Sequence, residues 1–185
     1  LITGGTGTLG RLVARHLVVA YGVRDVVLVS RGGGGVGVVE ELSALGARVR
    51  VVAADVADRG AMAALVGSLG GLSVVVHAAG VVEDGLVGGL DAGRVDRVLA
   101  AKVAGGVVLD EVTRGRDLAG FVVFSSAAGV LGGPGQGAYA AGNAFVDALV
   151  SWRRGRGLPG VSLGWGLWAE RSGITGGLGQ ADLAR

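Results

Sequence analysis

Four side chains that can exchange protons and hydrogen bonds are spaced so that they could meet at one edge of a sheet. Ser126 follows the apolar run at 121–124, Tyr139 comes thirteen residues later, and Asn143 lies four positions beyond Tyr139. Residues four apart share a face of a helix, so the phenol and the amide are expected to face the same way. Lys102 lies on an earlier helical pattern, and its ammonium can approach the phenol if that helix runs antiparallel beside the helix of Tyr139. Each residue alone also has an ordinary explanation, as a turn hydroxyl, a half-buried aromatic, a surface amide and a solvated charge.

A glycine-rich segment near the start of the chain has the pattern of a phosphate-binding turn. It reads Thr3-Gly4-Gly5-Thr6-Gly7-Thr8-Leu9-Gly10, between the end of a strand and an amphipathic helix. Glycines at 4, 7 and 10 let the backbone approach a pyrophosphate, and the helix N-terminus attracts its charge. Because the chain contains 39 Gly, such a turn alone is a weak signal. The strand before it and the helix after it favour a dinucleotide site.

The end of the second strand favours NADPH over NADH. It carries Ser30 and Arg31, where an acidic residue would bind a ribose 2′-hydroxyl. A hydroxyl and a guanidinium suit a 2′-phosphate instead. A solvated surface arginine is the alternative explanation of Arg31.

Two further segments follow strands at the edge where doubly wound sheets bind ligands. We expect them to form the adenine and ribose walls. They are Asp55 and Val56 after the third strand, and His77, Ala78, Ala79 and Gly80 at the end of the fourth.

Continuous apolar runs alternate with helical patterns, which predicts an α/β fold. The expected architecture is a Rossmann-type doubly wound parallel sheet with helices on both faces. Strands are expected near 26–29, 49–53, 74–76, 121–124 and 161–163, and helices over 9–22, 38–45, 61–69, 94–113 and 139–154. The run Gly32–Gly35 is interpreted as a flexible loop, with a phosphate-binding role as the less favoured alternative because no helix is predicted to start directly after it.

Composition narrows the function further. The chain has 185 residues and a net charge of only +2, so we expect a single domain and no nucleic-acid partner. It has no Cys and only the distant His16 and His77, so no metal site is expected. Apolar runs are far shorter than the roughly 20 residues of a membrane span, so we expect a soluble, cytoplasmic protein without a membrane partner. The chain starts at Leu1 and stops at Arg185 inside an apparent helix, which suggests truncation at both ends.

These motifs together resemble the short-chain dehydrogenase/reductase superfamily, and specifically the ketoreductase domains of modular polyketide synthases. The matching strings are Ile2–Gly10, Val76–Gly80, Phe124–Ser126, Gly135–Phe145 and Trp165–Trp168. Most short-chain reductases carry Lys four residues after the Tyr. This subfamily has Asn there and supplies Lys from the earlier helix, an exchange that Asn143 and Lys102 fit.

The resemblance implies reduction of the β-carbonyl of a 3-oxoacyl thioester on an acyl carrier protein, within polyketide biosynthesis and beside other synthase domains. Tyr139 would protonate the developing alkoxide and Ser126 would hydrogen-bond the carbonyl oxygen. Lys102 would lower the phenol pKa and hold the nicotinamide ribose, and Asn143 would orient Lys102 or a bridging water. Two alternatives stay open: a free-standing reductase of a diffusible ketone, and a non-catalytic nucleotide-binding module.

The resemblance also bears on substrate orientation. A Leu-Asp-Asp motif marks B-type domains, which yield a D-configured 3-hydroxyl, and this chain has Val82-Glu83-Asp84. The A-type mark is a Trp eight residues before the Tyr, where this chain has Leu131. The proline two residues after the Tyr that accompanies α-epimerisation is Ala141 here, so no epimerisation is expected. The family places Trp165 and Trp168 beside the nicotinamide, at the hinge of the substrate lid, although such residues are often core aromatics. It also implies a structural subdomain upstream of residue 1.

Overall fold

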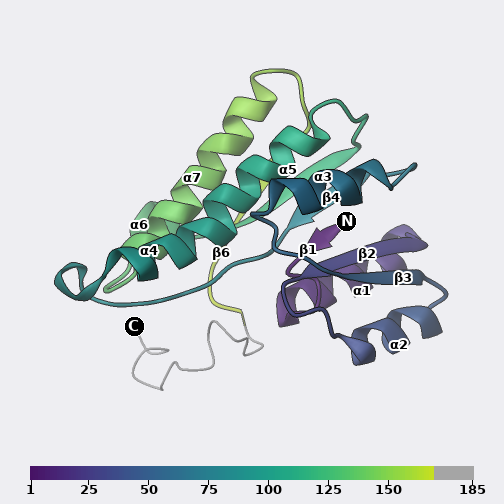
Figure 1. Ribbon diagram of the computed structural model, residues 1–185, viewed down its shortest axis with the longest axis horizontal. Coiled ribbons are helices and arrows are strands. Elements are labelled where there is room, and N and C mark those ends of the chain that lie inside the picture. The colour runs from purple at the N-terminus through teal and green to yellow at the C-terminus, as the bar shows by residue number, and fades with distance from the viewer. Residues whose placement is uncertain (169–185) are drawn as a thin grey trace.

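Six parallel strands form one sheet in the computed structural model, which describes residues 1–168 (Figure 1). The strand order is β3-β2-β1-β4-β5-β6, so the direction of winding reverses between β1 and β4. The strands are β1 (Ile2–Thr3), β2 (Asp25–Ser30), β3 (Arg48–Ala53), β4 (Val74–His77), β5 (Gly120–Ser126) and β6 (Val161–Trp165). The predicted α/β doubly wound sheet is confirmed, and its ligand-binding crevice is expected at the β1/β4 switch point.

Helices cover both faces of the sheet and bury its apolar side chains in two cores. One core contains Leu28 and Phe124 and lies under α1 (Thr8–Tyr21) and α2 (Val36–Ala44). The other core contains Phe121 and Val123. It lies under α3 (Arg59–Gly67), α5 (Gly105–Thr113) and α7 (Gly137–Arg154). Because β5 supplies side chains to both cores, its apolar run is continuous rather than alternating.

The helix expected over 94–113 forms, but it is interrupted where Lys102 lies. It consists of α4 (Ala92–Leu99), a π-helical segment η2 (Ala100–Ala104) and α5. Short π segments occur frequently at functional sites, and this one contains the candidate lysine. Two short elements were not predicted from the sequence, the 3₁₀ turn η1 (Val87–Gly89) and α6 (Ala128–Leu131).

The antiparallel arrangement that was set as a condition for Lys102 to approach Tyr139 is not the one that the structure shows. Lys102 contacts α7 at Gly142, Gly106 lies beside Leu149, and Asp110 bonds Arg153. Because residue numbers rise together in these pairs, the two helices run in the same direction, side by side (Figure 1). Parallel strands require this arrangement, since each crossover helix must return the chain from the carboxyl edge of the sheet to the amino edge.

Helix α2 begins two residues earlier than predicted, directly after the glycine run. Gly33, Gly34 and Gly35 all have positive φ, between 62° and 85°. A Cβ on Gly35 would lie 2.8 Å from Thr6 Cγ2, so the run folds tightly onto the phosphate-type turn. The reason given above for disfavouring a phosphate-binding role of this run, that no helix starts directly after it, therefore does not hold.

Residues 1–168 contain neither a helix of the membrane-spanning kind nor a cluster of metal-ligating side chains. None of the helices in this part of the chain is long and apolar enough to cross a membrane. Within the same residues, no group of three His, Cys, Asp or Glu side chains is placed to hold a metal ion. The apparent helix at Arg185 lies outside the described residues.

Candidate active site

The glycine-rich turn between β1 and α1 is too tightly packed to tolerate side chains. A Cβ on Gly10 would lie 2.3 Å from the carbonyl oxygen of Gly4, and one on Gly5 would lie 2.8 Å from Leu28. Gly4 has a φ of 66°, and a Cβ on this residue would lie 2.9 Å from the backbone of Ala79. Gly7 donates its N–H to Gly4 and precedes the first residue of α1. The turn thus leaves bare backbone at a helix N-terminus, which fits a pyrophosphate.

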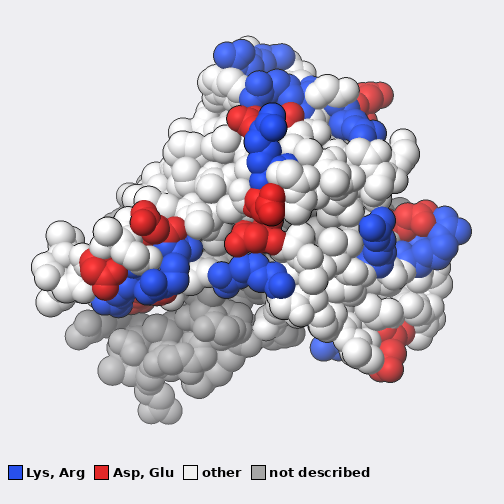
Figure 2. Space-filling model, in the orientation of Figure 1, with Lys and Arg blue, Asp and Glu red and all other residues white. Residues whose placement is uncertain are grey.

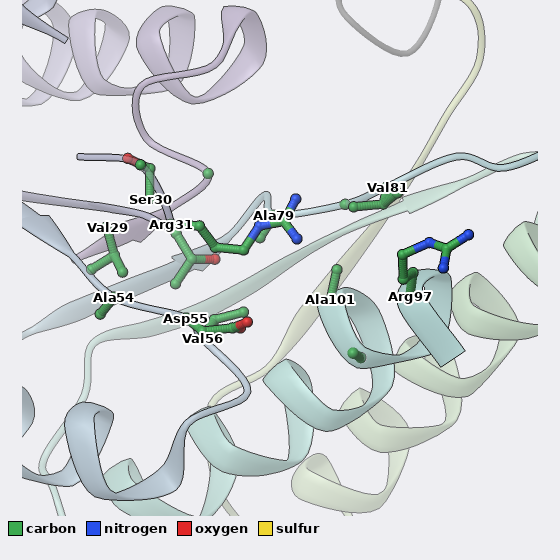
Figure 3. A pocket seen from close by; sticks show the side chains of 15 residues that line it. Val29, Ser30, Arg31, Ala54, Asp55, Val56, Ala79, Val81, Arg97 and Ala101 are labelled. Carbon is green, nitrogen blue, oxygen red and sulfur yellow. The ribbon is translucent and has the colours of Figure 1, made fainter. Parts of the chain in front are cut away.

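A cavity of about 460 Å³ opens beside this turn, at the carboxyl ends of the central strands (Figure 3). It is lined by Thr3, Gly4, Val29, Ser30, Arg31, Gly32, Ala54, Asp55, Val56, Ala79, Gly80, Val81, Arg97, Ala100 and Ala101. The structure therefore brings together the predicted residues at the ends of β1, β2, β3 and β4. The volume lies within the range of small-molecule sites.

Arg31 and Ser30 occupy the β2 end of this cavity. Figure 3 shows the Arg31 side chain extending from β2 toward Ala79. The Ser30 hydroxyl donates to the carbonyl of Gly33 at 2.9 Å, which closes the turn after the strand. Its oxygen keeps free acceptor capacity, whereas its proton is already used inside the turn.

His77 does not line the cavity, so the expectation that it forms a cofactor wall is wrong. Its ring is fully buried, and burial beside Lys102 lowers its pKa to about 3, so the imidazole is neutral. Nε2 lies 3.4 Å from the Lys102 carbonyl, which can only accept, so Nε2 carries the proton. Nδ1 therefore accepts from the Thr3 hydroxyl at 2.7 Å. His77 joins β1 and β4 to the π segment as a structural support.

The other residues of the turn lie outside the first cavity. Thr6 and Gly7 line a separate cavity of about 400 Å³ with Arg11, Arg15 and Glu41. Leu9 and Ala78 line the cavity that is described next and is called the second cavity. Gly5 and Gly10 line none of these cavities, but the absence of a Cβ at both positions allows the close packing of the turn.

The second cavity, of about 350 Å³, contains most of the predicted catalytic and orienting residues. Its lining includes Lys102, Ser126, Tyr139, Asp84, Leu131, Trp165 and Trp168. Gly80 lines both cavities, so a ligand along the turn would meet a second ligand in the space around Tyr139.

Lys102 is buried at the floor of this second cavity, with 4% of its surface exposed. Its Nζ donates to the main-chain carbonyl of Phe124, near the end of β5. Burial lowers the pKa of its ammonium to about 8, and the negative charge of Asp147 opposes that change. Gly142 lets the lysine stem pack against α7, since a Cβ there would lie 3.3 Å from Lys102 Cβ.

Ser126 and Tyr139 approach the cavity from neighbouring elements. Ser126 is the last residue of β5, and its hydroxyl oxygen accepts the N–H of Ala128 at 3.2 Å. That bond uses a lone pair and leaves the hydroxyl proton free to donate into the cavity. Tyr139 lies in the first turn of α7 and is half-buried.

Asn143 does not line the cavity with these three residues. It is fully buried, and its amide nitrogen donates to the carbonyl of Tyr139 at 2.8 Å. Its oxygen Oδ1 is buried without a partner among the described residues. A buried amide oxygen of this kind is costly unless a donor or a water satisfies it.

The two tryptophans form an aromatic wall at the β6 side of the cavity. Their ring centroids are 4.6 Å apart, and Phe124 lies 5.5 Å from the ring of Trp165. Both rings pack against the core under α1 while still lining the cavity. The core and cavity interpretations therefore both apply to Trp165 and Trp168.

Several residues at the cavities were not identified from the sequence. Gln136 donates to Asp84 at 3.3 Å, and Arg97 lines the first cavity. Gly142 could have been noticed as a glycine inside a helical pattern, where glycine is unfavourable without a packing reason. The surface pattern of α4 gave no comparable signal for Arg97.

Comparisons with known proteins agree with this geometry. A model of the KR domain family matches residues 1–170. Pikromycin polyketide synthase component PikAII of Streptomyces venezuelae is 55% identical over 194 residues, which cover 100% of this chain and 5% of that protein. Erythronolide synthase EryA2 of Saccharopolyspora erythraea is 55% identical over 97% of this chain and 5% of its own length. The chain thus spans about one-twentieth of the length of each of these two relatives.

Solved structures are similar over nearly the whole chain. An A1-type ketoreductase is 41% identical, with a TM-score of 0.91 over 99% of this chain and 39% of that one. The first ketoreductase of the tylosin polyketide synthase is 42% identical, with a TM-score of 0.89 over 100% of this chain and 41% of that one.

Proposed function

The chain belongs to the KR domain family, short-chain-type ketoreductases, and we propose that it reduces the 3-oxo group of an acyl thioester to a 3-hydroxyl, with NADPH as the reductant. The single observation that carries the proposal is the second cavity, where Lys102, Ser126 and Tyr139 meet beside the glycine-rich turn. We further propose that an acyl carrier protein presents the thioester and that other synthase domains flank this one, as the names of the relatives suggest.

The residues of the first cavity would hold the dinucleotide. The bare backbone of Gly4 and Gly7 would face the pyrophosphate at the start of α1. Arg31 would pair with the 2′-phosphate, as a guanidinium binds such a group through charged, directional hydrogen bonds. Asp55 and Val56 would bound the adenosine. When bound, NADPH supplies the hydride that reduces the carbonyl carbon.

Ser126 and Tyr139 would act on the carbonyl oxygen. The free hydroxyl proton of Ser126 would donate to that oxygen and stabilise its growing negative charge. The phenol of Tyr139 would then transfer its proton to the oxygen. The balance is one hydride added to carbon and one proton added to oxygen, which converts C=O to CH–OH and leaves a phenolate.

Lys102 would stabilise that phenolate. A buried ammonium in a low-dielectric site interacts more strongly with a neighbouring anion than a solvated one does. The pKa of about 8 leaves Lys102 mostly protonated at neutral pH. The unpaired Oδ1 of Asn143 supports a role in orienting Lys102 or a bridging water.

We also propose a D-configured product, because Asp84 lies at the second cavity and Leu131 occupies the position of the A-type tryptophan. No epimerisation of an α-substituent is expected with Ala141 in place of proline.

A direct assay tests the proposal. The chain is incubated with NADPH and a 3-oxoacyl thioester of N-acetylcysteamine, and the acyl product is identified by mass spectrometry. A product two mass units heavier, formed with loss of NADPH absorbance, is expected. Binding of NADPH without any reduction would instead favour a non-catalytic nucleotide-binding module.

A further inference from the structure

The loop between β4 and α4 separates the two cavities. Gly80 lines both, Val81 lines the first, and Asp84 lines the second. The path of this loop therefore decides where Asp84 stands beside the substrate space. Asp84 is exposed, so burial of its own side chain does not hold it there.

Arg94 on α4 holds the main chain of this loop. Its guanidinium donates to the carbonyl of Asp84 at 2.6 Å and to that of Gly89 at 3.1 Å. It also packs against Gly85, since a Cβ on that residue would lie 3.2 Å from the guanidinium nitrogens. The arginine thus spans the loop from Asp84 to Gly89.

Glu83 joins this arginine to a second one. Its carboxylate accepts from Arg97 through two nitrogens, at 2.5 and 2.8 Å, and lies 3.4 Å from Nε of Arg94. The hydrogen bonds from Arg97 hold the pKa of Glu83 below its usual value, so the side chain is ionised at neutral pH. Only 22% of it is exposed. Figure 2 shows acidic and basic side chains side by side over α4 and the loop before it.

Without Glu83, two like charges would face each other. Arg94 and Arg97 are three residues apart on α4 and so share a face, where like charges repel. The carboxylate between them removes that repulsion and keeps the Arg94 guanidinium against the loop. A neutral side chain of the same shape could still accept a hydrogen bond, but it would leave the repulsion in place.

The far side of the loop is bonded to the segment that leads to Tyr139. Gly85 donates its N–H to the carbonyl of Gly135 at 2.8 Å, and Gln136 donates to the carboxylate of Asp84. The loop is therefore bonded both to α4 and to the segment at the start of α7, and its position depends on both.

We propose that Glu83 is a positioning residue for substrate orientation, acting through Arg94 on the main chain of Asp84. Glu83 lines neither cavity, so its effect is exerted through the loop rather than by contact with a ligand. The inference rests on the proposed reductase function, because its consequence is the side from which the carbonyl is presented.

The test compares Glu83→Gln with the unaltered chain in two measurements. The first is hydrogen exchange of the Gly85 amide, which needs neither substrate nor turnover. Loss of this partly exposed ion pair should raise that exchange about two- to fivefold. The second is the ratio of 3-hydroxyl diastereomers formed from a 2-methyl-3-oxoacyl thioester. The minor diastereomer should rise by a similar factor, with KM increased more than kcat is decreased.

Two further variants separate positioning from a general structural effect. Glu83→Asp keeps the charge and should retain most of the parent's diastereomer ratio. Asp25→Asn removes a bidentate pair with Arg48 of 2.7 Å, at the start of β2, and should change neither measurement. Should Glu83→Gln fail to fold, Arg97→Gln removes the same contact from the other side. Because Arg97 also lines the first cavity, the exchange of the Gly85 amide is the criterion for that variant, and an unchanged exchange rate would overturn the positioning role.

The outcomes distinguish this inference from the proposed function. If the unaltered chain forms no 3-hydroxyl product, the proposed function fails, and the Gly85 exchange still decides whether Glu83 holds the loop. If the chain reduces the thioester and the Glu83→Gln variant keeps both its exchange rate and its product ratio, the positioning role is overturned.

Discussion

The ammonium of Lys102 donates to the main-chain carbonyl of Phe124, two residues before Ser126 at the end of β5. The lysine on one crossover helix is thereby fixed to the strand that carries the serine. This bond brings the ammonium into the cavity that Tyr139 lines.

Replacement of Tyr139 by Phe should abolish most turnover without abolishing NADPH binding. The ring remains to fill its place on α7, whereas the proton donor is lost. General acid catalysis alone supplies roughly 10²–10⁴-fold, so reduction of a 3-oxoacyl thioester should fall by about that factor. Fluorescence titration gives the binding constant and stopped assays give the rate. Turnover within tenfold of the parent would remove Tyr139 from the proposed role.

Replacement of Arg31 by Ala should weaken NADPH much more than NADH. Only the former carries the 2′-phosphate that the guanidinium would bind. The dissociation constants of both nucleotides are measured by calorimetry on the variant and the parent. Arg48→Ala, which removes an exposed guanidinium at the start of β3, is the matched control. Equal losses of both nucleotides in Arg31→Ala would contradict the assignment.

Replacement of Lys102 by Met should change how stability depends on pH. The lysine has a pKa of about 8 in the folded chain and about 10.4 when unfolded, so between these values the unfolded state binds the extra proton. Stability therefore rises with pH across that window in the parent, and this contribution is absent in Lys102→Met. From pH 8 to pH 10, the unfolding free energy of the parent should therefore increase relative to that of Lys102→Met, by about 1 kcal/mol or more per pH unit. Urea titrations at several pH values measure it, and a constant difference would contradict the pKa.

Asp110→Asn should destabilise the chain strongly. Asp110 and Arg153 form an ion pair in which the side chains are 2% and 1% exposed, and Arg153 also lies 3.9 Å from the Phe121 ring centroid. Loss of one partner leaves a buried charge uncompensated, which costs about 3–5 kcal/mol. In contrast, Asp25→Asn in the exposed pair with Arg48 should cost less than about 1 kcal/mol. Similar small losses for both variants, in denaturant titrations, would contradict this distinction.

The configuration of the product tests the orientation argument for Asp84. The chain should convert a 2-methyl-3-oxoacyl thioester to a D-configured 3-hydroxyl and leave the α-centre of the consumed enantiomer unchanged. Chiral chromatography against synthetic standards separates the four diastereomers. An L-hydroxyl product would refute the role drawn for Asp84 and Leu131.

The fold was predictable because its signals are local. Apolar runs predicted β2 to β6 within a few residues, and Gly22, with its positive φ, ended α1 where expected. The relative direction of two crossover helices depends on the sheet that joins them, and the antiparallel condition set for Lys102 came from considering that helix pair alone. The π segment likewise depends on contacts made by His77 and Lys102 across the fold.

The site was predictable where a motif fixes backbone and side chain together. Ser126, Tyr139 and Arg31 line the cavities for that reason. His77 was misplaced because strand ends contribute alternately to the crevice and to the core, and the motif does not say which. Glu83 and Arg97 interact across the loop and α4, which no sequence spacing predicts.

The parallel run of the Lys102 helix and α7 has a mechanical consequence. A lysine four residues after the tyrosine would share its helix, so the two side chains would move together. Here Lys102 and Tyr139 lie on two different helices. The buried bond between Asp110 and Arg153 joins these helices near their C-terminal ends, away from the cavity. Loss of this ion pair on heating would weaken the packing that fixes the Lys102 helix relative to α7. The chain should therefore lose turnover at a lower temperature than it loses helical structure.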